Sequence, residues 1–218
     1  MARHTVGEVE NSIPKPVVVL ANGNPPSHRH PLFILNNAAT LICTDGAAIT
    51  AVKLGCIPDV IIGDMDSMEE AHIPPECEVI AMTGQHNTDL EKVLEWCVEK
   101  NVPSATLLGL SGMREDHMMA NFTVFSEYSH RLKLTAVTDY GIIHHVAGNE
   151  SFDCKPGATV SLLLATSEPV ISSHGLEYTL KAEKLKTGSH GISNRAENGH
   201  FSLEVSGGSL FLFTGHID

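Results

Sequence analysis

Four short segments of the sequence carry aspartates in positions where acidic side chains can do chemistry. They are Thr44-Asp45-Gly46, Gly63-Asp64-Met65-Asp66-Ser67, Asn87-Thr88-Asp89 and Arg114-Glu115-Asp116-His117. Asp64 and Asp66 alternate directly after a β-branched run, and Mg²⁺ in proteins is typically held by one or two carboxylates, with water and phosphate oxygens as its other ligands. The segments therefore indicate a site for a divalent cation and a phosphorylated ligand.

Each of these side chains also has an ordinary structural explanation. A carboxylate in the first turn of a helix is favoured by the helix dipole, which would account for Asp89 and Asp116. Arg114 would then be a local ion partner of Asp116, and Ser67 would be a helix N-cap. What the four segments share is their expected position at one edge of a sheet, and that shared position favours a common site.

Short apolar runs that each end in a polar turn predict the strands of a parallel sheet. Such runs occupy residues 17–20, 41–44, 60–62, 78–80 and 106–108, and a further run at 32–35 is compatible with a helix or a strand. Ligands of open parallel sheets bind outside the carboxyl ends of the strands. The aspartates follow those ends, so the sheet is expected to gather them.

Helices are predicted between the strands. Leu90, Val93, Leu94, Cys97 and Val98 recur with helical spacing, and Thr88 with Glu91 forms a capping box, so one helix is expected to begin near Asp89. Ser67 with Glu70 offers a second, weaker capping box, and a further helix is expected over residues 115–128. This alternation of strand and helix predicts an α/β domain.

The pattern changes from about residue 132 onward. Apolar and polar residues alternate in short runs, and no helical stripe follows Tyr128, which predicts a tail of short antiparallel strands. We therefore expect a Rossmann-like α/β domain with a parallel sheet over residues 1–140, followed by a small all-β sandwich domain over residues 141–218.

The composition limits the partners. The chain has 218 residues, 42% of them hydrophobic, and a formal net charge of −12. Nucleic acid and anionic membranes demand a basic face, so neither is expected as a partner. No run approaches the ~20 apolar residues of a membrane span, and the N-terminus has no apolar signal-peptide core, which predicts a cytoplasmic protein. The five cysteines form no C-x-x-C pair, and the 13 histidines are dispersed.

Four longer stretches sharpen these expectations: C-T-D-G-A-A, P-D-V-I-I-G-D-M-D-S, N-T-D-L-E-K and G-M-R-E-D-H-M-M-A-N. In this order, from Asp45 to Asn121, they resemble the motifs of the thiamine pyrophosphokinase family. In the C-terminal half, G-L-E-Y and G-I-S-N are similar to that family's G-L-x-[WY] and x-S-N segments. The resemblance implies an enzyme that uses Mg²⁺ to transfer the pyrophosphoryl group of ATP to the hydroxyethyl oxygen of thiamine, giving thiamine diphosphate and AMP.

The resemblance also implies roles for individual residues. Those implied to hold Mg²⁺ are Asp64, Asp66, Asp89 and Asp116, which would act in catalysis together with Arg114. Those implied to border the nucleotide are Asn22, Gly23, Asp45, Gly46, Ser67, Arg114 and His117. Those implied to contact thiamine are Gln85, Asp89, Tyr178, Ser193 and Asn194. Family members place the thiamine site between two subunits, which implies a homodimer.

Two departures from the family pattern and several alternatives stand beside this hypothesis. Ala47 replaces a second glycine after Asp-Gly, and Gln85-His86-Asn87 lacks the charged residue that many members carry before Thr-Asp. Asp89 and Asp116 are both candidates for the general base, and His117 is expected to fix its loop. A different metal-dependent nucleotide transferase would also use D-x-D, and a non-catalytic nucleotide- or thiamine-sensing module would share the same binding residues.

Overall fold

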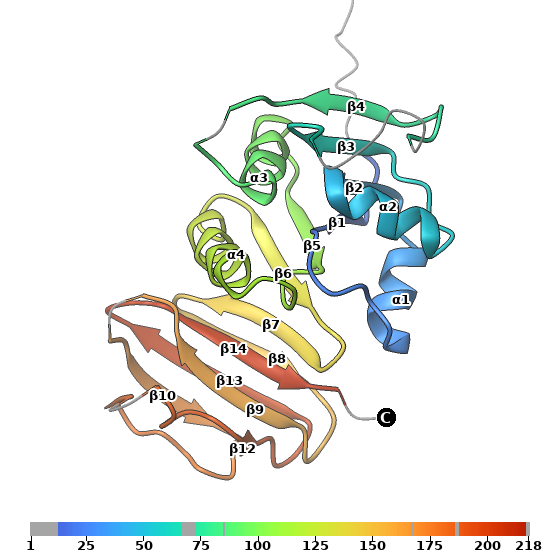
Figure 1. Cartoon of the computed structure of the whole chain (residues 1–218). Coiled ribbons are helices and arrows are strands. Elements are labelled where there is room, and N and C mark those ends of the chain that lie inside the picture. Colours follow the sequence, from blue (N-terminus) through green and yellow to red (C-terminus); the bar gives the residue numbers. More distant parts are fainter. Residues whose placement is uncertain (1–12, 67–72, 85, 167, 186–187, 217–218) are drawn as a thin grey trace, which may run out of the picture.

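The fold is mixed α/β, with one large sheet and a separate, smaller antiparallel sheet (Figure 1). The computed structural model describes residues 13–66, 73–84, 86–166, 168–185 and 188–216. Its elements, in chain order, are β1 (Val17–Leu20), α1 (Arg29–Asn36), β2 (Thr40–Thr44), α2 (Asp45–Lys53), β3 (Val60–Gly63), β4 (Glu78–Ala81), α3 (Asp89–Glu99), β5 (Ser104–Leu108), α4 (Glu115–Tyr128), β6 (Lys133–Val137), β7 (Gly141–Val146), β8 (Asn149–Asp153), β9 (Thr159–Leu164), β10 (Val170–His174), β11 (Glu183–Lys184), β12 (Asn194–Arg195), β13 (His200–Ser206) and β14 (Leu210–Gly215).

The large sheet has ten strands in the order β12-β9-β14-β7-β6-β5-β1-β2-β3-β4. From β6 to β4 all neighbours are parallel. The chain enters at β1, adds β2, β3 and β4 on one side, and then returns to add β5 and β6 on the other side. The direction of winding therefore reverses between β1 and β5, and crevices at such reversals are where open α/β sheets bind ligands.

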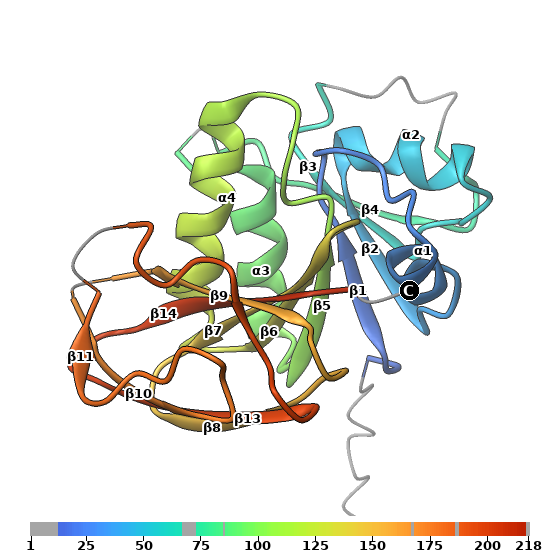
Figure 2. The ribbon, with the colours of Figure 1, turned by 90° about the horizontal axis from the view of Figure 1, so that it is seen from below.

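Helices cover both faces of the parallel part, as Figure 2 shows. Alternate strand residues point to opposite faces. Val17 and Val19 of β1 therefore pack in one core with α3 and α4, whereas Val18 and Leu20 pack in another with α1 and α2. Burial on both faces explains why these strands appear in the sequence as continuous apolar runs.

A third core lies between the two sheets in the C-terminal half. The small sheet has the order β11-β10-β13-β8, and its residues Ile171, Phe201 and Leu203 pack against Leu162 and Leu212 of the large sheet. The tail thus contains the predicted short antiparallel strands. Hydrogen bonding between β6 and β7 carries the large sheet across residue 140, and the division into two domains at that point stays a prediction.

Most of the predicted elements of the N-terminal half are confirmed. Thr88 Oγ1 accepts a hydrogen bond from the Glu91 N–H at 3.3 Å and so caps α3, and α4 covers the residues expected. The undecided run at 32–35 is helical and belongs to α1. The expected capping box of Ser67 and Glu70 lies outside the described residues.

Two expectations were wrong. Asp45-Gly46 is not a turn, because α2 begins at Asp45, and its good helix formers Ala47, Ala48 and Ala51 pack on the sheet. The alternating run at 132–137 does not begin the antiparallel tail, because β6 pairs in parallel with β5. One face of β6 is more exposed than the central strands, which is why its pattern resembles that of an antiparallel strand. Among the described helices, none is long and apolar enough to cross a membrane.

An ion pair ties the α3 and α4 layer together. Glu95 on α3 accepts two hydrogen bonds from the Arg131 guanidinium, at 2.7 and 2.8 Å, and one from the Tyr128 hydroxyl at 2.8 Å. The bonds from Arg131 and Tyr128 lower the pKa of Glu95 to about 2. The carboxylate is therefore stabilised in its charged form in the folded chain.

We expect Glu95→Gln to lower the free energy of unfolding by about 1 kcal/mol at pH 7, the upper end for a pair this exposed. Because the folded-state pKa is depressed, the contribution is present above the ordinary pKa and is lost as pH falls toward 2. Urea unfolding at pH 7 and at pH 3 measures the difference, with Glu99→Gln as the exposed control on the same helix. A deficit that stays equal at both pH values would contradict this assignment.

Candidate active site

Three carboxylates meet at the carboxyl ends of β2 and β3. Asp45, Asp64 and Asp66 each offer an oxygen, and the three oxygens lie within 4.8 Å of one another. Carboxylates this close repel one another, and the repulsion grows as the local dielectric constant falls. A hard divalent cation relieves the repulsion and prefers such oxygen ligands, so the donor set fits Mg²⁺.

Asp45 owes its position to the start of α2 and to a glycine on the neighbouring strand. It is only 2% exposed and lies in the first turn of α2, where the helix dipole favours a negative charge. A Cβ at Gly63 would lie 2.8 Å from Asp45 Cγ, closer than real Cβ contacts come. The glycine that precedes Asp64 therefore makes room for the carboxylate of a different motif.

The Asp64-Met65-Asp66 turn brings its two carboxylates to the same side through an unusual backbone. Met65 has a φ of 66°, in the left-handed region that residues with side chains seldom adopt. Asp64 Oδ1 accepts a hydrogen bond from the Asp66 N–H at 3.2 Å, and this bond lowers the pKa of Asp64 below its ordinary value. Backbone strain of this kind is concentrated at functional sites.

Asp89, at the start of α3, is joined to a buried lysine. Lys92 Nζ lies 2.8 Å from Asp89 Oδ1, and the lysine side chain is only 7% exposed. The positive charge of Lys92 also acts on Asp64, lowering its pKa further. Lys92 thus connects the start of α3 with the carboxylates of β3. Sequence reasoning missed it, because Lys92 lies between the stripe residues Leu90 and Val93 and its position carries no signal of burial.

Arg114 and Asp116 form a pair at the start of α4. Arg114 Nε and Nη2 donate to the two oxygens of Asp116 at 3.1 and 2.6 Å, and the pKa of Asp116 falls to about 2 because of these bonds and the His117 N–H. Both side chains are more than half exposed. The guanidinium therefore stays charged in the solvent at this edge of the sheet, where it can meet phosphate oxygens.

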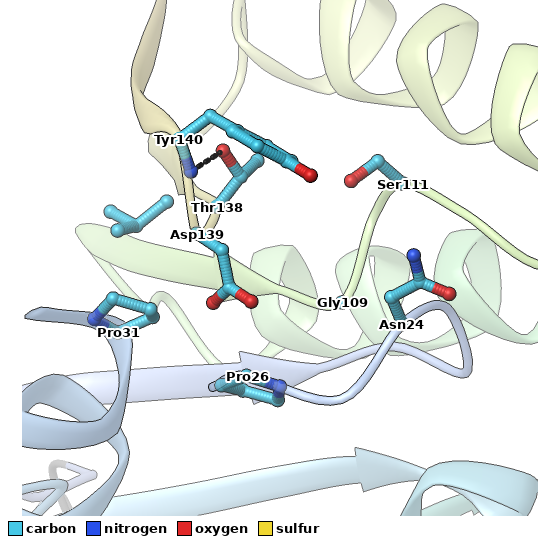
Figure 3. A pocket seen from close by; sticks show the side chains of 9 residues that line it. Asn24, Pro26, Pro31, Gly109, Ser111, Thr138, Asp139 and Tyr140 are labelled. Atoms are coloured by element: carbon cyan, nitrogen blue, oxygen red, sulfur yellow. Dashed lines mark hydrogen bonds between the residues drawn. The ribbon is translucent and has the colours of Figure 1, made fainter. Parts of the chain in front are cut away.

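A pocket lies beside these residues, at the reversal between β1 and β5. Loops after β1, β5 and β6 line it together with Pro31 of α1 and Val137 of β6 (Figure 3). The loop residues are Asn24, Pro26, Gly109, Ser111, Thr138, Asp139 and Tyr140. The loops touch through backbone: the Asn24 N–H donates to Ser111 O at 2.8 Å, and a Cβ at Gly23 would lie 2.2 Å from Gly109 O. Gly23 is therefore required by close packing.

The same loop after β1 also reaches the carboxylate cluster. A Cβ at Gly46 would lie 2.2 Å from the Asn22 side-chain nitrogen, so Asn22 sits directly on the first turn of α2. The predicted nucleotide residues Asn22, Gly23, Asp45 and Gly46 are thus brought together.

The predicted thiamine residues of the C-terminal half lie elsewhere. Asn194 on β12 holds the segment at Tyr178, accepting from the Tyr178 N–H at 3.0 Å and donating to Tyr178 O at 2.7 Å. The Ser193 N–H donates to Ser161 Oγ at 3.0 Å, and the Tyr178 ring is exposed. β12 is one edge of the large sheet, eight strand spacings from β3. At about 4.8 Å per spacing, this is on the order of 40 Å along the sheet.

The predicted residues therefore fall into two groups. Asn22, Gly23, Asp45, Gly46, Asp64, Asp66, Asp89, Arg114, Asp116 and His117 all follow parallel strands at one edge, whereas Tyr178, Ser193 and Asn194 gather around β12. Ser67 and Gln85 lie outside the described residues. The three-carboxylate cluster includes Asp45, which sequence reasoning placed beside the nucleotide, and the metal roles of Asp89 and Asp116 stay predictions.

Comparison with known proteins points to one family. The family model described as "Thiamin pyrophosphokinase, catalytic domain" matches residues 33–136, which contain the carboxylate cluster and the starts of α3 and α4. Thiamin pyrophosphokinase 1 of Caenorhabditis elegans is 25% identical over 193 residues, covering 81% of this chain and 79% of that protein. Thiamine pyrophosphokinase of Bacillus subtilis is 30% identical over 86 residues, covering 37% of this chain and 40% of that protein.

Solved structures share the fold. The crystal structure of thiamine pyrophosphokinase from Bacillus subtilis aligns with a TM-score of 0.78 at 20% identity, covering 93% of this chain and 99% of that one. Thiamin pyrophosphokinase from Candida albicans aligns with a TM-score of 0.74 at 17% identity, covering 92% of this chain and 89% of that one. Both the large and the small sheet therefore belong to an architecture already seen in crystals.

We expect Gly63→Ala to weaken divalent-cation binding about tenfold, because the added methyl group displaces the Asp45 carboxylate from Asp64 and Asp66. Isothermal titration with Mg²⁺ and with Mn²⁺ measures the affinity. Gly188→Ala is the matched control, since a Cβ there meets nothing within 4 Å. Equal affinity in the two variants would show that the contact between Asp45 and Gly63 does not position the cluster.

Proposed function

We propose that this chain is a member of the thiamine pyrophosphokinase family, whose catalytic-domain model it matches, and that it transfers the pyrophosphoryl group of ATP to the hydroxyethyl oxygen of thiamine. The products are thiamine diphosphate and AMP. The observation that carries the proposal is the cluster of Asp45, Asp64 and Asp66 inside the region that matches the catalytic domain. An acidic cluster repels a polyphosphate, because both are negatively charged. A divalent cation bound to the polyphosphate removes that repulsion.

We propose that Asp45, Asp64 and Asp66 hold Mg²⁺, with Asp89 and Asp116 close to the same ATP. The bound cation would neutralise charge on the phosphate oxygens and orient the triphosphate. Lys92 keeps Asp89 in place, and its charge adds a positive contribution at the β3 end of the cluster. Arg114 presents donors that match phosphate oxygens.

Proton transfer from the thiamine hydroxyl requires an acceptor near the reacting atoms. Asp116 is the weaker candidate, because the pair with Arg114 lowers its pKa to about 2. Lys92 engages only one oxygen of Asp89, at 2.8 Å, whereas Arg114 donates to both oxygens of Asp116. We therefore propose Asp89 as the acceptor, with His117 fixing the loop through its N–H bond to Asp116.

The separation of the two groups of site residues supports a homodimer. Tyr178, Ser193 and Asn194 lie at the opposite edge of the sheet from Asp64, and one chain therefore has no means of placing both groups on one thiamine. We propose that a second copy supplies them, so that each thiamine is bound between two subunits. The exposed Tyr178 ring and Ile192 side chain are apolar surface that such an interface would cover.

The strand order supports a Rossmann-like description of residues 1–140. Its reversal between β1 and β5 creates the crevice that nucleotide-binding sheets of that kind use. We propose that this part binds ATP and that residues 141–218 form a second domain, which contributes the thiamine contacts at the interface.

We expect Asp66→Asn to slow thiamine diphosphate formation by about 100-fold or more, because a carboxylate that holds the cation contributes several kcal/mol to transition-state stabilisation. The assay follows AMP and thiamine diphosphate with ATP, Mg²⁺ and thiamine. Asp153→Asn, an exposed aspartate of the smaller sheet, is the control.

Three results would contradict the proposal. Near wild-type turnover in Asp66→Asn would show that Asp66 does not hold the catalytic cation. Release of a nucleoside diphosphate without dependence on thiamine would indicate another D-x-D nucleotide transferase. Ligand-dependent stabilisation without any turnover by the wild-type chain would indicate a sensing module.

A further inference from the structure

Three histidines from two distant parts of the chain meet next to the pocket at the β1–β5 reversal. His28 and His30 lie at the start of α1, and His216 follows β14, whose end lies beside α1 (Figure 2). The rings of His28 and His216 stack with their centroids 4.6 Å apart and their planes 7° from parallel. His30 Nδ1 lies 3.4 Å from His216 Nδ1. The proposed reaction uses none of these three side chains, which we call the histidine cluster.

The histidine cluster holds the turn between β6 and β7. The His216 N–H donates to Tyr140 O at 3.1 Å, and His216 Nε2 lies 2.9 Å from Thr138 O. The His28 N–H donates to Asp139 Oδ1 at 3.0 Å on the same turn. These three turn residues line the pocket (Figure 3). The contacts of the cluster therefore keep one wall of the pocket in place.

The hydrogen bonds determine where the protons of the neutral rings lie. A carbonyl oxygen only accepts, so His216 Nε2 carries a proton toward Thr138 O, and Nδ1 of the neutral ring carries none. His30 Nδ1 is then the donor in the contact between the two rings. The pair can hold one additional proton, because the two Nδ1 atoms can exchange the roles of donor and acceptor. A second additional proton leaves two N–H groups facing each other across 3.4 Å, so the contact is lost.

The surroundings on α1 also oppose positive charge at His30. It is the second residue of α1, where the helix dipole is positive, and the first turn of this helix carries no acidic side chain. Arg29 adds a positive charge on the same turn. Burial, together with the charges of His216 and His28, lowers the pKa of His30 below its ordinary value.

The other elements around the cluster supply one negative charge, and it lies beside His28. The titratable side chains of the β6–β7 turn are Asp139 and Tyr140, and the Tyr140 ring is 82% exposed. Burial alone would raise the pKa of Asp139, but its bonds from His28 and Ser27 lower it below its ordinary value. This carboxylate is therefore already charged in mild acid. β14 carries no charged side chain. The acid-sensitive contact is therefore the one between His30 and His216.

We propose that the contact between His30 and His216 is a pH switch that holds the end of β14, the start of α1 and the β6–β7 turn together. It is closed while at most one of the two rings carries an additional proton, and it opens when both do. The change falls at about pH 6, where histidines ordinarily titrate. Opening releases one wall of the pocket, so the pocket is assembled at neutral pH and loosened in acid.

Amide hydrogen exchange at pH 7.5 and pH 5.5 tests the switch. At pH 5.5 two separated imidazoles with an ordinary pKa of about 6.5 take up two protons, whereas the closed pair takes up one, which favours opening about tenfold relative to pH 7.5. Exchange at residues 27–30, 138–141 and 214–216, corrected for its intrinsic pH dependence, should therefore accelerate about tenfold in wild type. In His30→Gln the new amide can donate to His216 or accept from it, so the acceleration should stay within about twofold.

Two further variants complete the comparison. His216→Gln removes the other ring but keeps a donor for Thr138 O, and it should match His30→Gln. His174→Gln removes an exposed histidine at the end of β10 and should behave as wild type. Exchange in α3 reports opening of the whole domain and should change by the same factor in all four proteins.

Persistence of the tenfold acceleration in both His30→Gln and His216→Gln would overturn the inference. An acceleration in wild type below about twofold would do the same, as would one of equal size in α3 or its loss in His174→Gln. Because exchange is measured without substrates, the result is independent of whether the chain forms thiamine diphosphate.

Discussion

The repulsion among three carboxylates at the ends of β2 and β3 is the constraint around which this part of the molecule is built. Asp45, Asp64 and Asp66 bring their oxygens within 4.8 Å of one another, and Asp45 is almost wholly buried. Charges in this arrangement are costly unless something positive offsets them. Within the described chain, the start of α2 and the ammonium group of Lys92 supply part of that offset. In the function we propose, a bound divalent cation would complete it and would bring the phosphates of the substrate to the cluster.

Helices that pack on both faces of the sheet stabilise the strand ends that carry these carboxylates. β1, β2 and β3 are buried on both faces between helix layers, so packing from both sides holds their carboxyl ends. Glycines at the ends then allow backbone and side chains of separate loops to touch, as Gly63 does against Asp45 and Gly23 does against Gly109. Local strain at Met65 and at Met113, which precedes Arg114, is tolerated because the surrounding structure holds both turns.

The two groups of predicted site residues lie at opposite ends of one continuous sheet. The parallel end carries the charged groups that suit a metal and polyphosphate, and the antiparallel end carries the exposed Tyr178 and the Ser193 and Asn194 segment. Asn194 is buried and satisfied by its bonds to the Tyr178 backbone, so its role within one chain is to shape the surface. In the proposed homodimer, each active site would combine the parallel end of one subunit with the antiparallel end of the other.

Much of the fold could be predicted from the sequence, because its determinants are local. Apolar runs predicted β1, β2, β3 and β5, and the cap at Thr88 and the stripe beginning at Leu90 predicted α3. The motifs predicted the family whose model matches residues 33–136, and they predicted that Asp64 and Asp66 would lie together at the end of one strand. The errors also have local causes: α2 was missed because Asp45-Gly46 is typical of a turn, and β6 was misassigned because an outer parallel strand has the alternating pattern of an antiparallel one.

The remaining features depend on contacts between residues far apart in the sequence, and only the tertiary structure decided them. It added Asp45 to the carboxylates of β3, buried Lys92 beside them, and joined Asp139 to Ser27 and His28 across more than 100 residues. It also placed Ser193 and Asn194 at the far edge of the sheet. Periodicity and caps act within a few residues, whereas these contacts depend on strand order and on the direction in which the chain winds. Residue types and spacing therefore indicated the chemistry that we propose, and the strand order of the sheet determined which of those residues lie together.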